Sequence, residues 1–230
     1  MLVTWPWVSP PAAAAHRLRF SDADVVGRVH EVRAWFAERG RRQFTWWVGD
    51  SATPGDLAER LAALGAEPWD EEPLIATMLV TDAPPPVDGV EVVPVDTYER
   101  FVLAQEVSWR ASVLSEDEIA SRRERLETRW HRRRAEETTY LALVDGQPVA
   151  SGAMLACPFA GFLSGAATLP EARGRGAFRA LVRARWDEAV RRGTPALVVG
   201  AGAMSRPILE RIGFRVVSET RVFVDRSSRS

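Results

Sequence analysis

The stretch Ala167-Thr-Leu-Pro-Glu-Ala-Arg-Gly-Arg-Gly-Ala177 decides the interpretation of this sequence. It joins a predicted strand to a predicted amphipathic helix. The N–H groups at a helix start have no partner within the helix, and together with the helix dipole they favour an anion. Gly174 and Gly176 allow a phosphate to approach the backbone, while Arg173 and Arg175 add charge-assisted donors. We expect a pyrophosphate here; the alternative is a glycine turn with solvated arginines.

Composition narrows the class of protein. The chain has 230 residues, of which 46% are hydrophobic and 27% charged, and its formal net charge is -1. These values are typical of a soluble globular protein and give no global reason to expect a nucleic-acid or acidic-membrane partner. All 30 basic residues are arginine, which excludes lysine nucleophiles and Schiff bases. The single cysteine, Cys157, and three scattered histidines predict neither a disulfide nor a metal site.

The sequence gives no signal for a membrane or for secretion. The segment Met1–Pro10 lacks a basic region and is interrupted by prolines, so it is a poor signal peptide. No stretch approaches the ~20 apolar residues that a membrane span needs. We expect a cytoplasmic protein, and a homo-oligomer is compatible with the sequence.

A proline-rich segment divides the chain. Thr81-Asp-Ala-Pro-Pro-Pro-Val-Asp-Gly89 cannot continue a helix or a central strand, which predicts a semi-rigid linker. The predicted organisation is an N-terminal unit at residues 1–82, a linker at 83–89 and a larger domain at 90–230. In this domain the patterns predict helices over Val95–Trp109, Ser115–Glu137, a segment after the glycine loop and Pro207–Ile212, and strands over Tyr140–Val144, Pro148–Ala156, Phe162–Leu169, Pro195–Val199 and Arg215–Asp225.

The N-terminal unit repeats the last part of this order. Phe44–Val48 followed by glycine resembles Ala196–Val199 followed by glycine, and Leu57–Leu64 resembles Ile208–Ile212 in the same way. A further strand at Leu74–Val80 corresponds to the last strand of the chain, and a helix over Asp22–Arg39 to the one after the glycine loop. We interpret residues 1–82 as a degenerate half-copy of the C-terminal domain; chance similarity between two helix-strand units is the alternative.

Together with this element order, the glycine loop resembles that of the GNAT superfamily of N-acetyltransferases, over residues from about 90 to 230. Arg173 to Gly176 match the first four positions of the family's Gln/Arg-x-x-Gly-x-Gly/Ala loop, which binds the pyrophosphate of acetyl-CoA, whereas Phe178 replaces its usual small residue. The resemblance implies an α/β fold of GNAT type, with a mixed, mostly antiparallel sheet flanked by helices. The cofactor-binding residues it implies are Ala167, Thr168, Leu169, Arg173, Gly174, Arg175, Gly176, Ala177 and Phe178.

The resemblance is weaker on the catalytic side. The closing helix of the family often carries a tyrosine acid, and Leu209 stands there; Gly202 replaces an often-present asparagine. Amine acylation still needs a proton acceptor. Glu106 is a candidate base and Ser205, like Ser164, a candidate hydroxyl; the alternatives are a solvated carboxylate and structural serines. The candidate acceptor-groove residues are Trp109 and Trp130, and core packing is the alternative for these aromatic side chains.

The sequence is compatible with three functions. The leading interpretation is an acyl-CoA-dependent N-acyltransferase, with acetyl-CoA as donor and a small-molecule, peptide or protein amine as acceptor, acting by direct aminolysis. The second is a non-catalytic acyl-CoA-binding or interaction module. The third is a nucleic-acid-binding protein, suggested by the arginines at 122–134, but glutamates interleave with them, which favours a solvated helix.

Overall fold

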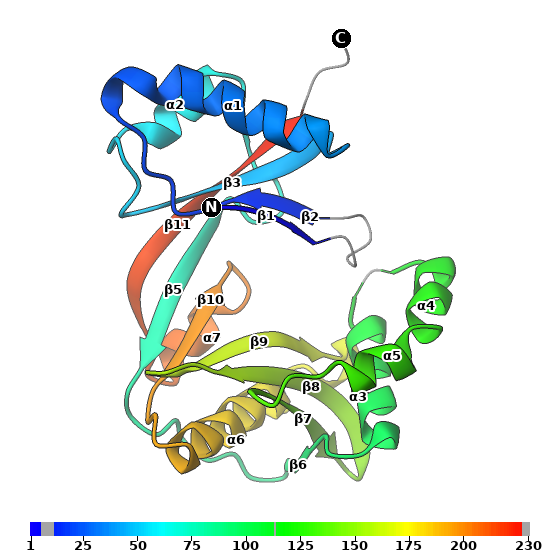
Figure 1. Cartoon of the computed structure of the whole chain (residues 1–230). Helices are drawn as coiled ribbons and strands as arrows, with labels where there is room; N and C mark the ends of the chain where they lie inside the picture. The colour runs from blue at the N-terminus through cyan, green and yellow to red at the C-terminus, as the bar shows by residue number, and fades with distance from the viewer. Residues whose placement is uncertain (6–11, 113, 227–230) are drawn as a thin grey trace. The chain divides into compact units, whose positions relative to one another are not determined.

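The computed structural model describes residues 1–5, 12–112 and 114–226 (Figure 1). Half of the segment considered above as a signal peptide, residues 6–10, lies outside the described residues. The chain forms two compact units. The N-terminal unit comprises Met1–Thr77, Gly200–Pro207 and Val216–Ser230, and the central unit comprises Met78–Val199 and Ile208–Arg215.

The central unit is built on a mixed, mostly antiparallel sheet. Its strands follow in the order β6-β7-β8-β9-β10, antiparallel except for β9 and β10, which are parallel. The crossover between these two strands is the helix α6. The strand bounds are β6 Glu91–Pro94, β7 Glu137–Val144, β8 Gln147–Ala156, β9 Gly161–Thr168 and β10 Leu197–Ala201.

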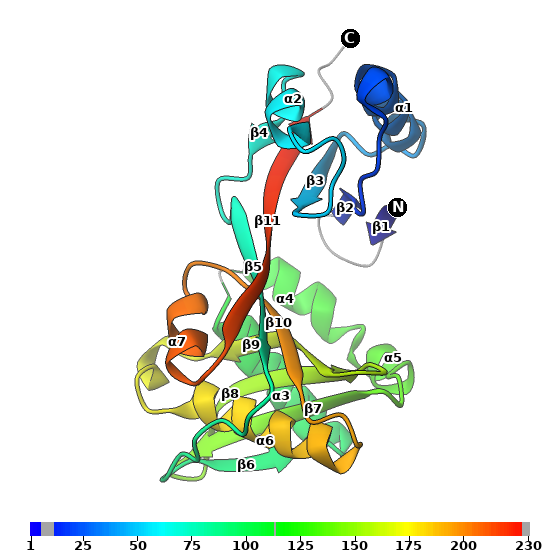
Figure 2. The ribbon, with the colours of Figure 1, turned by 90° about the vertical axis from the view of Figure 1, so that its left-hand side faces the viewer.

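Helices cover both faces of this sheet (Figures 1 and 2). The hydroxyl of Ser151 on β8 donates to the carbonyl of Ala104 on α3, whereas the next residue, Gly152, faces Arg185 on α6. Neighbouring residues of a strand point to opposite faces, so α3 and α6 lie on opposite sides of the sheet. The helices and 3-10 turn of this part of the chain are α3 Tyr98–Arg110, α4 Glu116–Arg123, α5 Leu126–His131, η2 Pro170–Ala172, α6 Ala177–Arg191 and α7 Arg206–Arg211.

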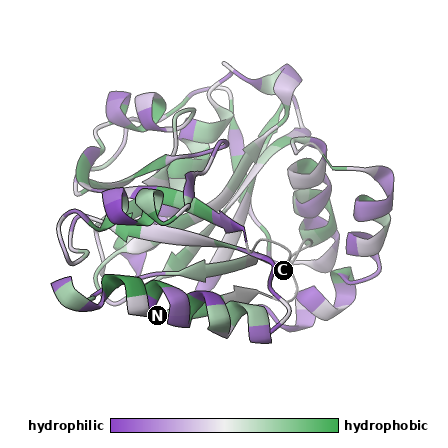
Figure 3. Cartoon of the chain, turned by 90° about the horizontal axis from the view of Figure 1, so that it is seen from above, coloured by the Kyte–Doolittle hydropathy of each residue, from purple (hydrophilic) through white to green (hydrophobic). Residues whose placement is uncertain are grey.

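Apolar side chains of these helices and strands form one core, which includes Phe101 on α3, Leu141 on β7 and Leu181 on α6. Hydrophilic residues interleave with hydrophobic ones along the helices (Figure 3). Burial of a large apolar side chain contributes roughly 1.5–3 kcal/mol, so this core fixes where α6 begins relative to β9.

The N-terminal unit has its own core, around the fully buried Phe36, Trp46 and Leu61. Strands β1 and β2 are antiparallel, β2 and β3 are parallel, and β11 is antiparallel to β3 and to the short β4. Helices α1 and α2 pack against each other. The bounds are β1 Leu2–Trp5, β2 Ala12–Ala15, η1 Asp22–Asp24, α1 Val25–Glu38, β3 Gln43–Gly49, α2 Leu57–Ala63, β4 Glu67–Pro68, β5 Leu74–Val80 and β11 Arg215–Arg226.

Both units contain the same sequence of pairings. In the central unit the antiparallel pair β8–β9 is followed by a helix and by the parallel β10; in the N-terminal unit β1–β2 is followed by α1 and by the parallel β3. The interpretation of residues 1–82 as a half-copy of the C-terminal domain stays a prediction. The pairing of β11 with β3 places the last strand of the chain in the N-terminal unit, so the compact units differ from the expected division at residues 83–89.

Local predictions and the structure differ at three places. The single helix expected over Ser115–Glu137 is wrong: it is broken at Glu124 and Arg125 into α4 and α5, and its last residue belongs to β7. The helix expected from Val95 begins at Tyr98, where the Thr97 side chain accepts a hydrogen bond from Arg100 N. The capping box at Ser115 and Glu118 is confirmed. Strands β1, β2, β4 and β6 were not predicted.

Candidate acyl-CoA site

A bulge bends β9 away from β10. The register between β8 and β9 shifts between Ser151 and Ala153, and Gly165 in β9 has φ +58°, a left-handed conformation that favours glycine. Parallel pairing with β10 covers three residue pairs and ends at Val199 and Leu163. Beyond it, Ser164–Thr168 presents about 16 Å of strand edge at 3.3 Å per residue. An extended ligand with amide groups can pair with such an edge.

Ala167 and Thr168, two of the predicted cofactor residues, lie on this edge and are half-buried. They pair with Ser151 and Ala150 of β8 on their other side. Leu169, the next residue, is buried, and its N–H donates to Val149 O at 2.9 Å. Its side chain therefore belongs to the core, and its carbonyl oxygen already accepts a hydrogen bond from Ala172 N at 3.0 Å.

Two glycines of the loop before α6 have a left-handed backbone. Gly174 has φ +80° and Gly176 has φ +88°, and Gly176 is the N-cap of α6. Such values cost a residue with a Cβ roughly 1–2 kcal/mol. The first bond within the helix runs from Ala180 N to Gly176 O at 2.9 Å. The preceding N–H groups, from Ala177 on, have no acceptor within the helix and can meet an anion.

The two loop arginines differ in what they contact. Arg175 is paired with Asp145, in the turn between β7 and β8, with 2.7 Å between its guanidinium and the carboxylate. Arg173 is exposed. Phe178, the departure from the family pattern, lies in the first turn of α6 and is half-buried, so its ring packs partly against the protein. Arg173 is thus the more available cation for a phosphate.

Glu106, the candidate base, is held by an arginine. The Nε and Nη2 atoms of Arg123 donate to its two carboxylate oxygens at 2.8 and 3.0 Å. This side-chain hydrogen bonding raises the pKa of Arg123. Glu106 on α3 thus bridges to α4, and it can accept a proton from a substrate only after giving up part of this bidentate pair.

The two candidate hydroxyls, Ser205 and Ser164, are both half-buried. Ser205 is half-buried, and its Oγ donates to Gly202 O at 3.5 Å, at the limit of a hydrogen bond. Ser164 is half-buried on β9, at the start of the unpaired edge. Leu209, at the position of the family's tyrosine, is fully buried in α7.

Neither of the two tyrosines replaces the missing acid in α7. Tyr98 lies in the first turn of α3, with its ring edge toward Trp130. Tyr140 on β7 donates to Glu188 Oε2 at 3.3 Å, and burial together with the charge of Glu188 raises the pKa of its hydroxyl to about 12. The hydroxyl of Tyr140 is therefore hydrogen-bonded to the C-terminal half of α6 and not to the loop at its start.

One carboxylate at the end of β10 was not predicted. Gly202 leaves space for a side chain, and the carboxylate of Glu72 occupies this space and accepts a hydrogen bond from Ala203 N at 3.0 Å. Glu72 and Gly202 are 130 residues apart in the sequence. No local pattern links them, so sequence reasoning could find only the missing side chain at Gly202.

The two tryptophans considered for the acceptor groove differ in exposure. Trp109 is 2% exposed and belongs to the core of the central unit, so its ring has no open surface for an acceptor. Trp130 is half-buried, and the guanidinium of Arg133 stacks on its ring at 3.2 Å from the centroid. Phe101 also packs against Trp130, with 5.6 Å between the two ring centroids.

A buried arginine was also missed. Arg185 on α6 is fully buried, and burial lowers the pKa of its guanidinium to about 10. It donates to Leu181 O at 2.9 Å and to Ala153 O at 3.1 Å, while its Nη2 has no partner in the structure. Gly152 leaves the space that this guanidinium fills. The arginine thereby ties α6 to β8 beside the bulge.

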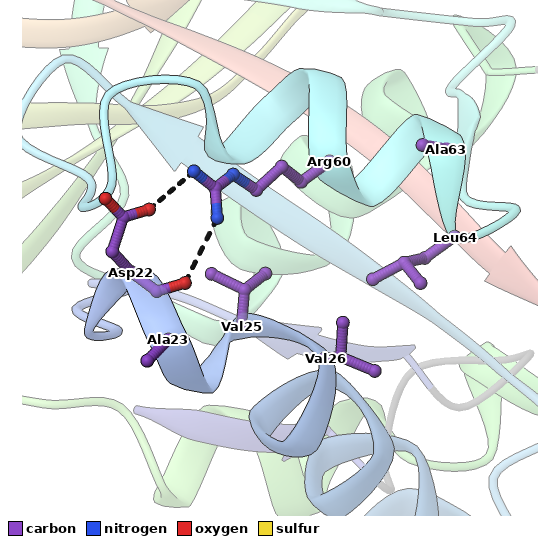
Figure 4. A pocket seen from close by; sticks show the side chains of 7 residues that line it. All are labelled: Asp22, Ala23, Val25, Val26, Arg60, Ala63 and Leu64. Atoms are coloured by element: carbon purple, nitrogen blue, oxygen red, sulfur yellow. Dashed lines mark hydrogen bonds and ion pairs between the residues drawn. The ribbon is translucent and has the colours of Figure 1, made fainter.

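The corresponding helix start in the N-terminal unit does not offer the same site. A hollow of about 230 Å³ lies between the start of α1 and α2, and Figure 4 shows Arg60 bound to Asp22 beside it. Two aspartates, Asp22 and Asp24, precede α1. The loop before α6 has glycines and arginines instead. The negative charges of Asp22 and Asp24 beside this helix start disfavour a phosphate.

Two findings concern other classes of site. In residues 1–5, 12–112 and 114–226, no group of three or more His, Cys, Asp or Glu side chains could hold a metal ion. No helix in the described part of the chain is long and apolar enough to span a membrane.

Comparison with known proteins agrees with this geometry. Residues 103–214 match the model of the acetyltransferase (GNAT) family, which includes the bulged strand, the glycine loop and α6. No curated protein matches the chain. This match covers just under half of the chain.

Solved structures share the fold over nearly the whole chain. A GCN5-related N-acetyltransferase from Kribbella flavida has a TM-score of 0.71 and 19% identity, covering 95% of this chain and 82% of its own. One from Sphaerobacter thermophilus has a TM-score of 0.64 and 18% identity, covering 96% and 74%. A tandem GNAT protein from the clavulanic acid biosynthesis pathway has a TM-score of 0.63 and 16% identity, covering 95% and 76%. The similarity thus includes a protein with two GNAT units.

Proposed function

We propose that the chain is an acyl-CoA-dependent N-acyltransferase that uses acetyl-CoA and transfers its acetyl group to an amine of a small molecule, a peptide or a protein. The observation that carries the proposal is the combination of the unpaired edge Ser164–Thr168 with the left-handed loop Arg173–Gly176 that follows it. Coenzyme A has a pyrophosphate suited to the loop and an arm with two amides suited to the edge.

The reaction proposed is direct aminolysis. The neutral amine attacks the thioester carbonyl, a C–N bond forms, the C–S bond breaks, and coenzyme A leaves as a thiolate that takes up a proton. With Leu209 in place of a tyrosine, water is the simplest proton donor for the thiolate. The loop and the strand edge contribute by holding the thioester in a fixed position.

The residue that accepts the proton of the amine can be identified by comparing the turnover of variants. Glu106 is paired with Arg123, and Ser205 has one long hydrogen bond. Turnover of Glu106→Gln and of Ser205→Ala separates these two candidates, since loss of a general base typically costs 10²–10⁴-fold in rate.

A non-catalytic acyl-CoA-binding module is the second candidate. The observation that favours it is the absence of an acidic hydroxyl from α7, where Leu209 is fully buried. Release of free thiol from acetyl-CoA, measured over a panel of amines, distinguishes the two. Turnover with any amine excludes the second candidate; binding of acetyl-CoA without turnover over the panel would favour it.

A further inference from the structure

The segment expected to be an interdomain linker packs along α6. Within it, Pro84 is buried, and its carbonyl oxygen accepts a hydrogen bond from Arg183 Nη1 at 3.0 Å. Three residues later, the half-buried Val87 reaches the glycine at the start of the same helix. The segment 84–87 is therefore fixed at two points on α6, Arg183 and Gly176, which are about two turns apart along the helix.

The contact of Val87 is with Gly176 of the phosphate loop. A Cβ on Gly176 would lie 2.7 Å from Val87 Cγ1, closer than two carbon atoms can approach. Val87 is β-branched, so its Cγ1 cannot easily rotate away. Gly174, two residues earlier, has a similar φ of +80° but nothing within 4 Å of where its Cβ would be. The two glycines thus share a left-handed backbone, but only Gly176 has another side chain, that of Val87, against the position of a Cβ.

We propose that Val87 is a positioning residue for the phosphate loop, and that the Pro84–Val87 segment forms a wall of the acyl-CoA site. The valine holds the backbone of Gly176 against the start of α6, so the N–H groups of this turn are directed toward the pyrophosphate before it binds. This inference rests on the proposed function.

The proline content of the segment supports such a role. Prolines at 84, 85 and 86 restrict the backbone, so little conformational entropy is lost when Val87 is held in place. Because a preformed loop binds its ligand without an ordering cost, the wall strengthens acetyl-CoA binding. By reciprocity, bound acetyl-CoA stabilises the segment.

A double-mutant cycle tests the proposal with acetyl-CoA as the titrant, measured by calorimetry. Val87→Ala alone should weaken binding about threefold to tenfold, and Gly176→Ala and Gly174→Ala should each weaken it more, owing to their left-handed backbone. Adding Val87→Ala to Gly176→Ala should restore at least about threefold of the loss, because the clash is removed. The same addition to Gly174→Ala should restore nothing.

Val190→Ala is the matched control, since Val190 lies on the same helix and is 47% exposed near its other end. It should leave the dissociation constant unchanged. Equal effects of Val87→Ala on both glycine variants, or none on the parent chain, would overturn the role of Val87. Absence of acetyl-CoA binding by the parent chain would instead overturn the proposed function, and the inference with it.

Amide hydrogen exchange on the unmodified protein gives an answer even where a glycine variant does not fold. Acetyl-CoA should slow exchange of the N–H groups from Val87 to Gly89 as well as those of the loop. Protection of the loop without any change at Val87 would contradict the proposal.

Discussion

Replacing Asp225 tests whether the last strand is an integral part of the N-terminal unit. Its side chain is 3% exposed and accepts hydrogen bonds from Arg33 Nε at 2.8 Å and from Trp46 Nε1 at 2.9 Å. Asp225→Ala leaves the buried indole N–H without a partner, at about 1–3 kcal/mol, and removes a charged hydrogen bond of about 1.5–3 kcal/mol. Arg33 keeps its bond to Leu64 O, which limits the loss. We expect the free energy of unfolding to fall by about 3–5 kcal/mol.

Urea unfolding followed by circular dichroism measures this change in the free energy of unfolding. Asp225→Asn keeps an acceptor for the indole and should cost less than Asp225→Ala. Glu31→Ala is the matched control: it breaks the exposed pair with Arg28, whose side chains are 51% and 64% exposed, and should cost less than about 0.5 kcal/mol. A loss below about 1 kcal/mol for Asp225→Ala would refute the reasoning that this network holds β11 in place.

Two further predictions concern the loop and a helix cap. Arg173→Ala should weaken acetyl-CoA binding about tenfold, whereas Arg175→Ala should weaken it less, because Asp145 already holds Arg175; calorimetric titration of both variants decides. Equal losses would show that the Asp145 pair opens on binding. Ser115→Ala removes the capping box of α4 and should lower the free energy of unfolding by about 0.5–2 kcal/mol in urea, with no effect on acetyl-CoA affinity.

Features set by neighbouring residues could be predicted from the sequence. The glycine loop is one: left-handed backbone at Gly174 and Gly176 follows from the absence of a Cβ, and the strand before and helix after fix its place. The Ser115 cap is another, because donor and acceptor are three residues apart. In both, the chemistry and the contact lie within one turn of chain.

Features that depend on distant contacts could not be predicted. The pairing of β11 with β3 joins residues more than 160 positions apart, and periodicity alone does not say which strand a buried strand will choose. The short strand Ala12–Ala15 has no β-branched or aromatic residue, so tertiary context overrides its propensity. Likewise, Val87 in a proline-rich segment reads as part of a linker until its contact with Gly176 is seen.

The candidate catalytic residues also divide into features that one sequence position decides and features that depend on distant contacts. The sequence shows that α7 lacks a tyrosine, since one position decides it. It does not show that Glu106 is paired with Arg123, or that the carboxylate of Glu72 lies at Gly202. The residues of the cofactor loop could be named from the sequence because they are neighbours along the chain. The proton acceptor could not be named because its surroundings come from distant residues.

Calorimetric titration of acetyl-CoA into the protein, with two glycine variants, tests the central claim most directly. We expect one site per chain, because Asp22 and Asp24 place negative charge beside the helix start of the N-terminal unit. Gly176→Glu should abolish binding by placing a carboxylate at the start of α6, whereas Gly193→Glu, at an exposed left-handed glycine beyond the other end of this helix, should bind as the parent does. Absence of binding by the parent chain at millimolar acetyl-CoA, or equal binding by both variants, would contradict the account.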